Sequence, residues 1–302
     1  MGLARRESGT LQIKDDRFWL YRRKLGGFWR LYRKSSLGKL GLIIVSFFVI
    51  VALAAPWIAP FDPFSFVGDP FLKPSSTHIF GTDQVGRDIF SRVIYGTRIS
   101  LLVGLVASAM TIGLGTSIGL VSVYLGGWID NALMRITDLF IIIPALPLML
   151  IMASILGKGI TNIIIVITVV GWTATARMVR SQTLSLKERP FTEASRAIGS
   201  SDLHTIARHI VPNVFPLVFA NGMIAIVDAI LSEAGLSFLG FGDPSAPSWG
   251  MVLHFADNAG ATVNGYWWYI VPPGICIMFL VMGFAFISYS TDQILNPRLR
   301  RR

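Results

Sequence analysis

The chain has 302 residues, of which 53% are hydrophobic and only 15% are charged, and its formal net charge is +10. The mean hydropathy is +0.60. About a quarter of the residues of a typical water-soluble domain are charged, so this composition excludes an ordinary soluble domain and indicates a membrane protein.

The charges are clustered, which leaves long charge-free runs between them. A helix needs about 20 apolar residues to cross about 30 Å of hydrocarbon, and it satisfies its own backbone polar groups there. We therefore predict an all-α membrane protein with six transmembrane helices. The expected spans lie approximately at residues 40–60, 100–124, 134–156, 160–180, 213–238 and 269–290.

The N-terminus does not resemble a cleavable signal, because about forty polar and basic residues precede the first apolar run and no A-x-A-like site follows it. We therefore expect the first span to be retained. The lone cysteine, Cys276, lies in the last predicted span and leaves no pair for an intrachain disulfide.

Charge asymmetry predicts the orientation, because Lys and Arg are retained on the cytoplasmic side of a membrane. With the N-terminus inside, the cytoplasmic segments hold 22 of the 27 Lys and Arg residues. Both termini are thus expected to be cytoplasmic. The expected parts are a basic amphipathic segment 1–38, a first transmembrane helix 39–60, an extracytoplasmic segment 61–98, a five-helix core 99–292 containing the loop 181–212, and a basic tail 293–302.

Residues 18–34 read FWLYRRKLGGFWRLYRK and interleave aromatic and basic side chains. Such a pattern is compatible with nucleic-acid binding. However, apolar residues recur at steps of three and four, which describes one face of a helix: Phe18, Tyr21, Leu25, Phe28 and Tyr32. A helix at the membrane surface is favoured over a nucleic-acid partner, because a span begins only a few residues later.

Two stretches that the predicted topology places outside the cell have patterns typical of membrane-surface structure. The cluster GYWWY at 265–269 is typical of an aromatic belt that anchors the last span. In segment 81–98, Val85, Ile89 and Val93 are four residues apart, which predicts a short helix on the outer surface. In the second span, Gly115 and Gly119 form a GxxxG that favours close helix packing.

Three carboxylates fall in or near predicted spans, where ionisable groups are functional candidates by default. Asp138 follows Arg135 by three residues, so a local ion pair is favoured. Asp228 is the candidate for the transport pathway, with bonding to a neighbouring helix as the alternative. Glu233 is also a pathway candidate, although its expected position near the outer interface favours simple hydration. Because five residues separate Asp228 from Glu233, the two point about 140° apart on the helix and do not predict a shared cation site.

The four histidines fall in different segments, without zinc-binding or metalloprotease spacing. A G-x-S-x-G elbow and a G-x-x-x-x-G-K-[ST] phosphate loop are also absent from the sequence. The chain is therefore not expected to be an enzyme or to carry a catalytic residue, a metal or a cofactor. Any ATP that drives its function must be bound by another subunit.

The loop 181–212 contains the stretch EASRAIGSSDLHTIARHIVP and predicts two short helices. Pro190 suits a first helical turn, and Glu193 suits the positive end of the helix dipole. Gly199 suits the left-handed residue that ends a helix. Ser201 or Asp202 can cap the second helix, whose apolar side would carry Leu203, Ile206 and Ile210 before Pro212 opens the fifth span. A rigid connector of this kind is suited to transmit force.

Several motifs resemble those of inner-membrane permease subunits of ATP-binding-cassette importers. EAS at 193–195, Gly199 and Pro212 resemble the EAA signature of these permeases, with Ser195 in place of the second Ala. GTDQVGRDIFSRVIYGTRISL at 81–101, EAGLSFLGFG at 233–242, SWG at 248–250 and NPRLR at 296–300 resemble the dipeptide, oligopeptide and nickel branch. The resemblance extends from about residue 37 to the C-terminus.

This resemblance implies a type I importer permease in a prokaryotic plasma (inner) membrane. The implied partners are a homologous second permease, two ATPase subunits or one two-domain ATPase that bind ATP and Mg²⁺, an extracytoplasmic solute-binding protein and membrane lipids. The residues implied to couple the permease to its ATPase are Glu193, Ala194, Ser195, Arg196, Ala197, Ile198, Gly199, Asp202 and Pro212.

The implied cargo is peptide, with oligosaccharides or nickel as alternatives. An ion-coupled secondary transporter, in which Asp228 would couple the ion, is a rival function. The loop 181–212 could also be only an amphipathic connector that lies on the inner headgroups.

Overall fold

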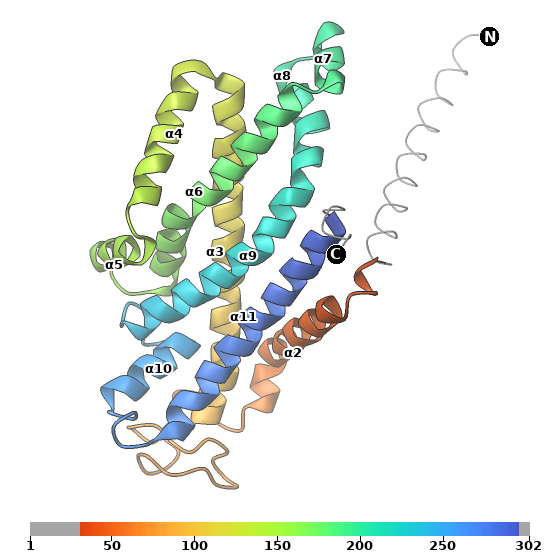
Figure 1. Cartoon of the computed structure of the whole chain (residues 1–302). Helices are drawn as coiled ribbons and strands as arrows, with labels where there is room; N and C mark the ends of the chain where they lie inside the picture. Colours follow the sequence, from red (N-terminus) through yellow and green to blue (C-terminus); the bar gives the residue numbers. More distant parts are fainter. Residues whose placement is uncertain (1–30, 296–302) are drawn as a thin grey trace, which may run out of the picture.

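The computed structural model describes residues 31–295 as a bundle of long helices with two distinct ends (Figure 1). One end, here called the elbow end, carries two short helices. The opposite loop end carries an irregular segment and a further short helix. The helices are α2 (Ser36–Ile58), α3 (Ile89–Leu125), α4 (Gly127–Ile142), α5 (Ala145–Leu156), α6 (Ile160–Lys187), α7 (Pro190–Ala197), α8 (Asp202–Thr205), a π-helical turn (Ile206–Ile210), α9 (Val211–Phe238), α10 (Trp249–Asn258) and α11 (Trp267–Leu295).

Among residues 31–295, five helices are long and apolar enough to cross a membrane, and the bent pair α4–α5 makes a sixth if it counts as one span. Three predicted spans match α2, α9 and α11 to within five residues, and the predicted span 160–180 begins with α6 but ends seven residues before it. The amphipathic pattern at Phe18, Tyr21, Leu25 and Phe28 lies outside the described residues, as does the motif at 296–300. The chain is thus an all-α protein whose described helices fit a multi-pass membrane protein.

The third predicted span, 134–156, is not one straight helix. It breaks at Ile143 and Pro144, where α4 and α5 meet at an angle of 96°. A proline disfavours the helical conformation in the residue before it, and Ile143 accordingly adopts an extended backbone with ψ of 127°. The prediction was wrong because hydropathy records that this run is apolar but not that it turns.

The second span is longer than predicted, because α3 begins at Ile89 rather than near residue 100. The carboxylate of Asp88 accepts a hydrogen bond from the backbone N–H of Ser91 at 2.8 Å and caps the helix. The predicted surface helix at 81–98 is therefore wrong: its first half is loop, and its second half is the start of α3. Ile89 and Val93 are buried in the core rather than lying on a surface.

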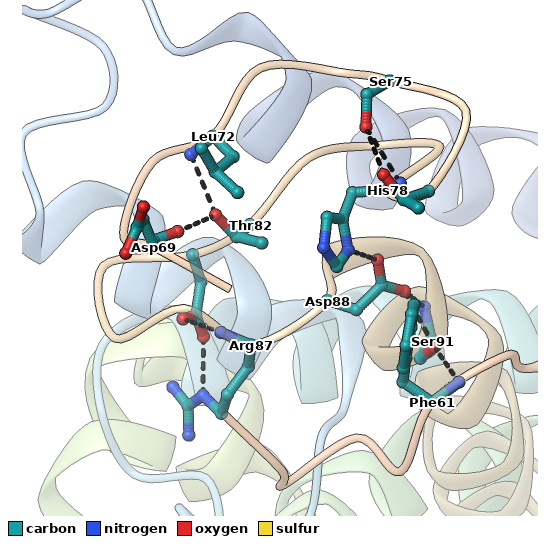
Figure 2. A network of polar contacts seen from close by, with 11 residues as sticks. Phe61, Asp69, Leu72, Ser75, His78, Thr82, Arg87, Asp88 and Ser91 are labelled. Atoms are coloured by element: carbon teal, nitrogen blue, oxygen red, sulfur yellow. Dashed lines mark hydrogen bonds and ion pairs between the residues drawn. The ribbon is translucent and has the colours of Figure 1, made fainter. Parts of the chain in front are cut away.

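Residues 59–88 form a structured cap on the loop end (Figure 2). The hydroxyl of Thr82 donates to the carbonyl of Asp69 at 2.6 Å, and the ring of His78 lies 3.0 Å from the carboxylate of Asp88. These bonds join distant turns of the segment, so the cap has a defined shape.

The aromatic cluster at 265–269 packs against this cap. Trp268 and Tyr269 are buried, and the Tyr269 hydroxyl donates to the side chain of Gln84 at 2.7 Å. Tyr266 stacks on Phe71 at a ring distance of 4.7 Å. Our prediction of simple interfacial anchoring was wrong for these residues, although Trp267 is 60% exposed.

The two described ends of the chain meet at one side of the bundle. α2 packs along α11, and the Ser35 and Ser290 hydroxyls lie 2.9 Å apart. Gly41 permits this approach, since a Cβ added there would lie 2.6 Å from the carbonyl oxygen of Gly283. The start of the first span and the end of the last span therefore lie together at one side of the bundle.

The GxxxG of α3 lies directly against α6, as expected. A Cβ added at Gly115 would lie 2.6 Å from the carbonyl oxygen of Trp172, and one at Gly119 would lie 2.7 Å from that of Ala176. These distances leave no room for a side chain, so the two backbones are in contact.

Replacing Gly119 with leucine should therefore destabilise the protein by about 2 kcal/mol or more, because a packed core accommodates extra methylene groups only with strain. The midpoint of thermal unfolding in detergent measures this loss. Gly113→Leu is the matched control on the same helix, because no atom lies within 4 Å of a Cβ added there. Equal midpoints for the two variants would show that α3 and α6 are not in backbone contact.

Candidate functional site

Residues 188–210, here called the elbow, connect α6 to α9 at the elbow end (Figure 1). α7 begins at Pro190, where the missing N–H breaks no helical hydrogen bond. Gly199 then takes the left-handed conformation with φ of +80° and lets the chain reverse. The backbone N–H of His204 donates to the Ser201 hydroxyl at 3.3 Å, which identifies Ser201 as the cap of α8.

Buried hydroxyls hold the elbow together. The Thr192 hydroxyl donates to the carbonyl of Leu186 at 2.8 Å, and the Thr205 hydroxyl donates to the carbonyl of Ser201 at 3.2 Å. Ser195 is 5% exposed, and its hydroxyl lies 3.4 Å from that of Thr205. The serine at this signature position thus bonds the two arms of the elbow, and the arms are fixed relative to each other.

An apolar cluster fixes the elbow to the bundle. Ile210 is fully buried and packs with Val179 and Leu186 of α6 and Val214 of α9. α8, the π-helical turn and α9 form one continuous helix, Asp202–Phe238. A displacement of the elbow is therefore transmitted directly to α9.

The outer face of the elbow carries exposed apolar side chains. Ile198 is 82% exposed and Leu203 is 76% exposed. The prediction that Leu203 shares one apolar side with Ile206 and Ile210 was wrong for Leu203, because the π-helical turn lies between Leu203 and Ile210, and only Ile210 is fully buried. The other exposed elbow residues among those expected to couple are Glu193, Ala194, Ala197, Gly199 and Asp202.

Two further expected residues belong to the elbow or follow it directly in the sequence. Arg196 lies in α7, and Pro212 stands in the first turn of α9, where it is exposed. No Cβ added at Gly199 would meet an atom within 4 Å. The face at Gly199 is thus open to a partner.

Two ion pairs join α6, the helix that leads into the elbow, to α4, and the sequence patterns did not reveal either of them. Arg180 of α6 donates two hydrogen bonds to Asp130 of α4, at 2.7 and 2.6 Å. Arg177 of α6 pairs with Asp138. The predicted pair of Asp138 with Arg135 is therefore wrong, because α6 offers a cation across the helix interface.

Glu233 is not hydrated, contrary to expectation. It is 1% exposed and accepts hydrogen bonds from the hydroxyls of Ser100 at 3.2 Å and Ser237 at 2.7 Å. Ser100 also accepts from the backbone N–H of Trp249 at 3.2 Å. α10 folds back over this end of α9, so Glu233 ties α3 to α9 instead of meeting water.

Asp228 lies on a different face of α9, as its spacing from Glu233 predicts. It is exposed, and it lines a pocket of about 100 Å³ between α3, α5, α6 and α9. The polar lining includes Asn221, whose amide donates to the hydroxyl of Thr175 at 3.2 Å. Within residues 31–295, no three His, Cys, Asp or Glu side chains gather as metal ligands would.

Comparison with protein families gives two matches. Residues 111–301 match the family described as "Binding-protein-dependent transport system inner membrane component". Residues 25–74 match "N-terminal TM domain of oligopeptide transport permease C". Together these two matches include α2, the elbow and the pocket.

Individual proteins agree with the family matches. The chain is 36% identical over 276 residues to the glutathione transport system permease protein GsiD of Escherichia coli O6:K15:H31. This alignment covers 90% of each chain. It is 34% identical over 276 residues to the dipeptide transport system permease protein DppC of Bacillus subtilis, covering 90% of this chain and 85% of that one.

A solved structure shares the fold. An inward-facing structure of the MetNI methionine ABC transporter contains a chain that aligns with a TM-score of 0.56 at 20% identity, covering 71% of this chain and 98% of that one. The family models and the relatives agree on a transport permease, and the solved structure agrees with the fold. The chain therefore belongs to the inner-membrane permease components of binding-protein-dependent ATP-binding-cassette transport systems, in the branch of the oligopeptide and dipeptide permeases.

Proposed function

We propose that this chain is one of two homologous permease subunits of a peptide importer, and that its elbow and both termini are cytoplasmic. Two cytoplasmic ATPase subunits, or one two-domain ATPase, bind ATP and Mg²⁺ and receive the elbows. A solute-binding protein delivers di- or oligopeptides at the loop end. Lipids surround the spans, and nucleic acid is not a partner.

The observation that carries this proposal is the elbow, which is rigid inside and apolar outside. A flexible connector could not transmit a displacement to α9. The hydrogen bonds of the Thr192 and Thr205 hydroxyls and the packing of Ile210 instead fix the elbow rigidly to that helix. Ile198 and Leu203 extend from this body into solvent, where isolated apolar side chains contribute nothing to the stability of the chain itself. They fit the groove of a partner.

Charge supports the orientation. Five basic residues lie in the elbow or in the part of α6 that leads into it: Arg177, Arg180, Lys187, Arg189 and Arg208. Basic residues concentrate on the cytoplasmic side of a membrane. The elbow end is therefore assigned to the cytoplasm, and the cap at 59–88 is assigned to the outside.

The relatives support a peptide cargo, because the glutathione and dipeptide permeases are both named for short peptides. Oligosaccharide and nickel import use the same kind of machinery and are the alternatives to exclude.

Affinity purification of the tagged chain should recover a second permease and an ATPase. In proteoliposomes loaded with ATP, the recovered assembly and its binding protein should take up radiolabelled dialanine, and an ionophore should leave this uptake unchanged. Omission of ATP should abolish it. Uptake that the ionophore abolishes and ATP omission does not would establish ion coupling, and import of nickel or an oligosaccharide in place of dialanine would overturn the peptide assignment.

A further inference from the structure

A polar stripe follows one face of α9, although the helix is otherwise apolar. Asn221, Asp228 and Ser232 recur at steps of seven and four residues, which places them on the same face. Asp228 lies ten residues, or about 15 Å, from the end of α9 at Phe238, which is near mid-depth of about 30 Å of hydrocarbon. A carboxylate at this depth is too costly to face lipid, so the stripe faces a solvated passage.

The pocket beside the stripe has an unsatisfied buried hydroxyl. Thr111 of α3 lines the pocket and is 6% exposed, and its hydroxyl oxygen has no hydrogen-bond partner within the described residues. Gly171 of α6 also lines the pocket and lies directly beside Thr111, since a Cβ added at Gly171 would lie 3.1 Å from the Thr111 methyl carbon. A buried polar group without a partner needs an explanation, and a polar group of a bound solute in the adjoining pocket would supply one.

The pocket contains an acidic side chain and no basic one. In the part of the chain that the structure describes, Asp228 makes no hydrogen bond or ion pair, and no Lys, Arg or His lines the pocket. The free acceptors are the Asp228 carboxylate and the Thr111 and Ser232 hydroxyl oxygens. An ammonium group carries three donors and no acceptor, so it matches this set.

We propose that this pocket binds the protonated amino terminus of the peptide during its passage, with Asp228 as the counter-ion. The inference rests on the proposed peptide cargo. Most peptide α-amino groups are protonated at neutral pH, since their pKa lies near 8. The pocket is small and partly open, so it holds one end of the peptide and leaves the rest in the passage.

The first test uses the complete importer in ATP-loaded proteoliposomes. The ratio of dialanine uptake to N-acetyl-dialanine uptake is measured for the wild-type chain, Asp228→Asn, Asp228→Glu and the control Asp292→Asn. The binding protein is the same throughout, so a change in this ratio reports the membrane step alone. We expect Asp228→Asn to lower dialanine uptake and the ratio about tenfold, and Asp228→Glu to lower the ratio less than Asp228→Asn does, because it keeps the negative charge. The control Asp292→Asn should stay within twofold of wild type.

The second test measures how fast charged thiol reagents label a cysteine in the pocket wall, and it does not depend on transport. Cys276→Ser removes the native thiol, and Ser232→Cys adds a reporter in the pocket wall. A cationic methanethiosulfonate should label this thiol at least tenfold faster than an anionic one, and Asp228→Asn should bring the two rates together. Dialanine should slow labelling by the cationic reagent in the chain that keeps Asp228, and it should have no effect in Asp228→Asn.

The results separate the two proposals. A wild-type assembly that imports no peptide overturns the peptide cargo. An assembly that imports dialanine with the same ratio for Asp228→Asn as for wild type overturns the ammonium site. No labelling by either reagent, with or without ATP, would show that the pocket is closed to water and would also overturn the site.

Discussion

Replacing Ile198 with aspartate is expected to lower ATP-driven uptake at least a hundredfold, while the amount of chain in the membrane stays unchanged. Ile198 is 82% exposed, so the substitution removes almost no packing within the chain. In the assembled importer the same position is proposed to be covered by the ATPase, and an unpaired carboxylate buried there costs several kcal/mol. Since about 1.4 kcal/mol is a factor of ten, that cost is enough for a hundredfold loss.

Two measurements check this expectation: peptide uptake into ATP-loaded proteoliposomes, and retention of the ATPase on the affinity-tagged chain. Both should fall together. The matched control is Val263→Asp, the same kind of change at a side chain that is 90% exposed and lies between α10 and α11. It should leave retention of the ATPase unchanged. If Ile198→Asp kept both the ATPase and normal uptake, the elbow would not be the docking face.

The parts that the sequence predicted well are those encoded by local signals. Charge-free runs mark the spans, because each helix must be apolar by itself to enter lipid. The elbow is also locally encoded: Pro190 opens α7, Gly199 reverses the chain and Ser201 caps α8. Each of these effects depends only on backbone geometry within a few residues.

The parts that the sequence did not predict depend on distant neighbours. Asp138 pairs with Arg177 of another helix rather than with the nearby Arg135. Glu233 is buried because α10, which we did not predict, folds back beside Ser100 and covers it. The pocket likewise brings together Thr111 and Asp228, which lie on separate helices. Periodicity within one helix cannot show which faces will meet.

The turn between α4 and α5 was missed for another reason. Pro144 lies within an apolar run, and a membrane span tolerates proline often enough that it does not by itself predict a break. Leu203 was misplaced because an α-helical period was assumed across the π-helical turn. In both places the composition was interpreted correctly and the local geometry was not.

Replacing Asp83 with alanine is expected to destabilise the protein by about 3–5 kcal/mol, because it leaves a buried cation without its counter-ion. The Asp83 carboxylate is fully buried and accepts hydrogen bonds from the backbone and side chain of Arg87, at 2.9 and 2.6 Å. The guanidinium of Arg92 is also fully buried, with its Nε 3.9 Å from the same carboxylate. Figure 2 shows where Arg87 approaches this turn of the cap.

The loss of stability should extend from the cap to the spans, because Arg92 belongs to the first turn of α3. Its guanidinium carbon also lies 5.5 Å from the ring centre of Phe255 in α10. Thermal unfolding of the purified importer should show a lower midpoint. The matched control is Asp69→Asn, an exposed position whose backbone carbonyl, not its carboxylate, binds Thr82. This control should leave the midpoint unchanged.

The double variant Asp83→Ala with Arg92→Met distinguishes a charge effect from simple loss of packing. Removing the second charge relieves the unpaired cation, since an apolar side chain of similar volume is tolerated where an ion pair was buried. Arg87 is 14% exposed and can reach water. The double variant should therefore be more stable than Asp83→Ala alone. If the losses of stability from Asp83→Ala and Arg92→Met were instead additive, the ion pair between these side chains would not be what holds the cap on the bundle.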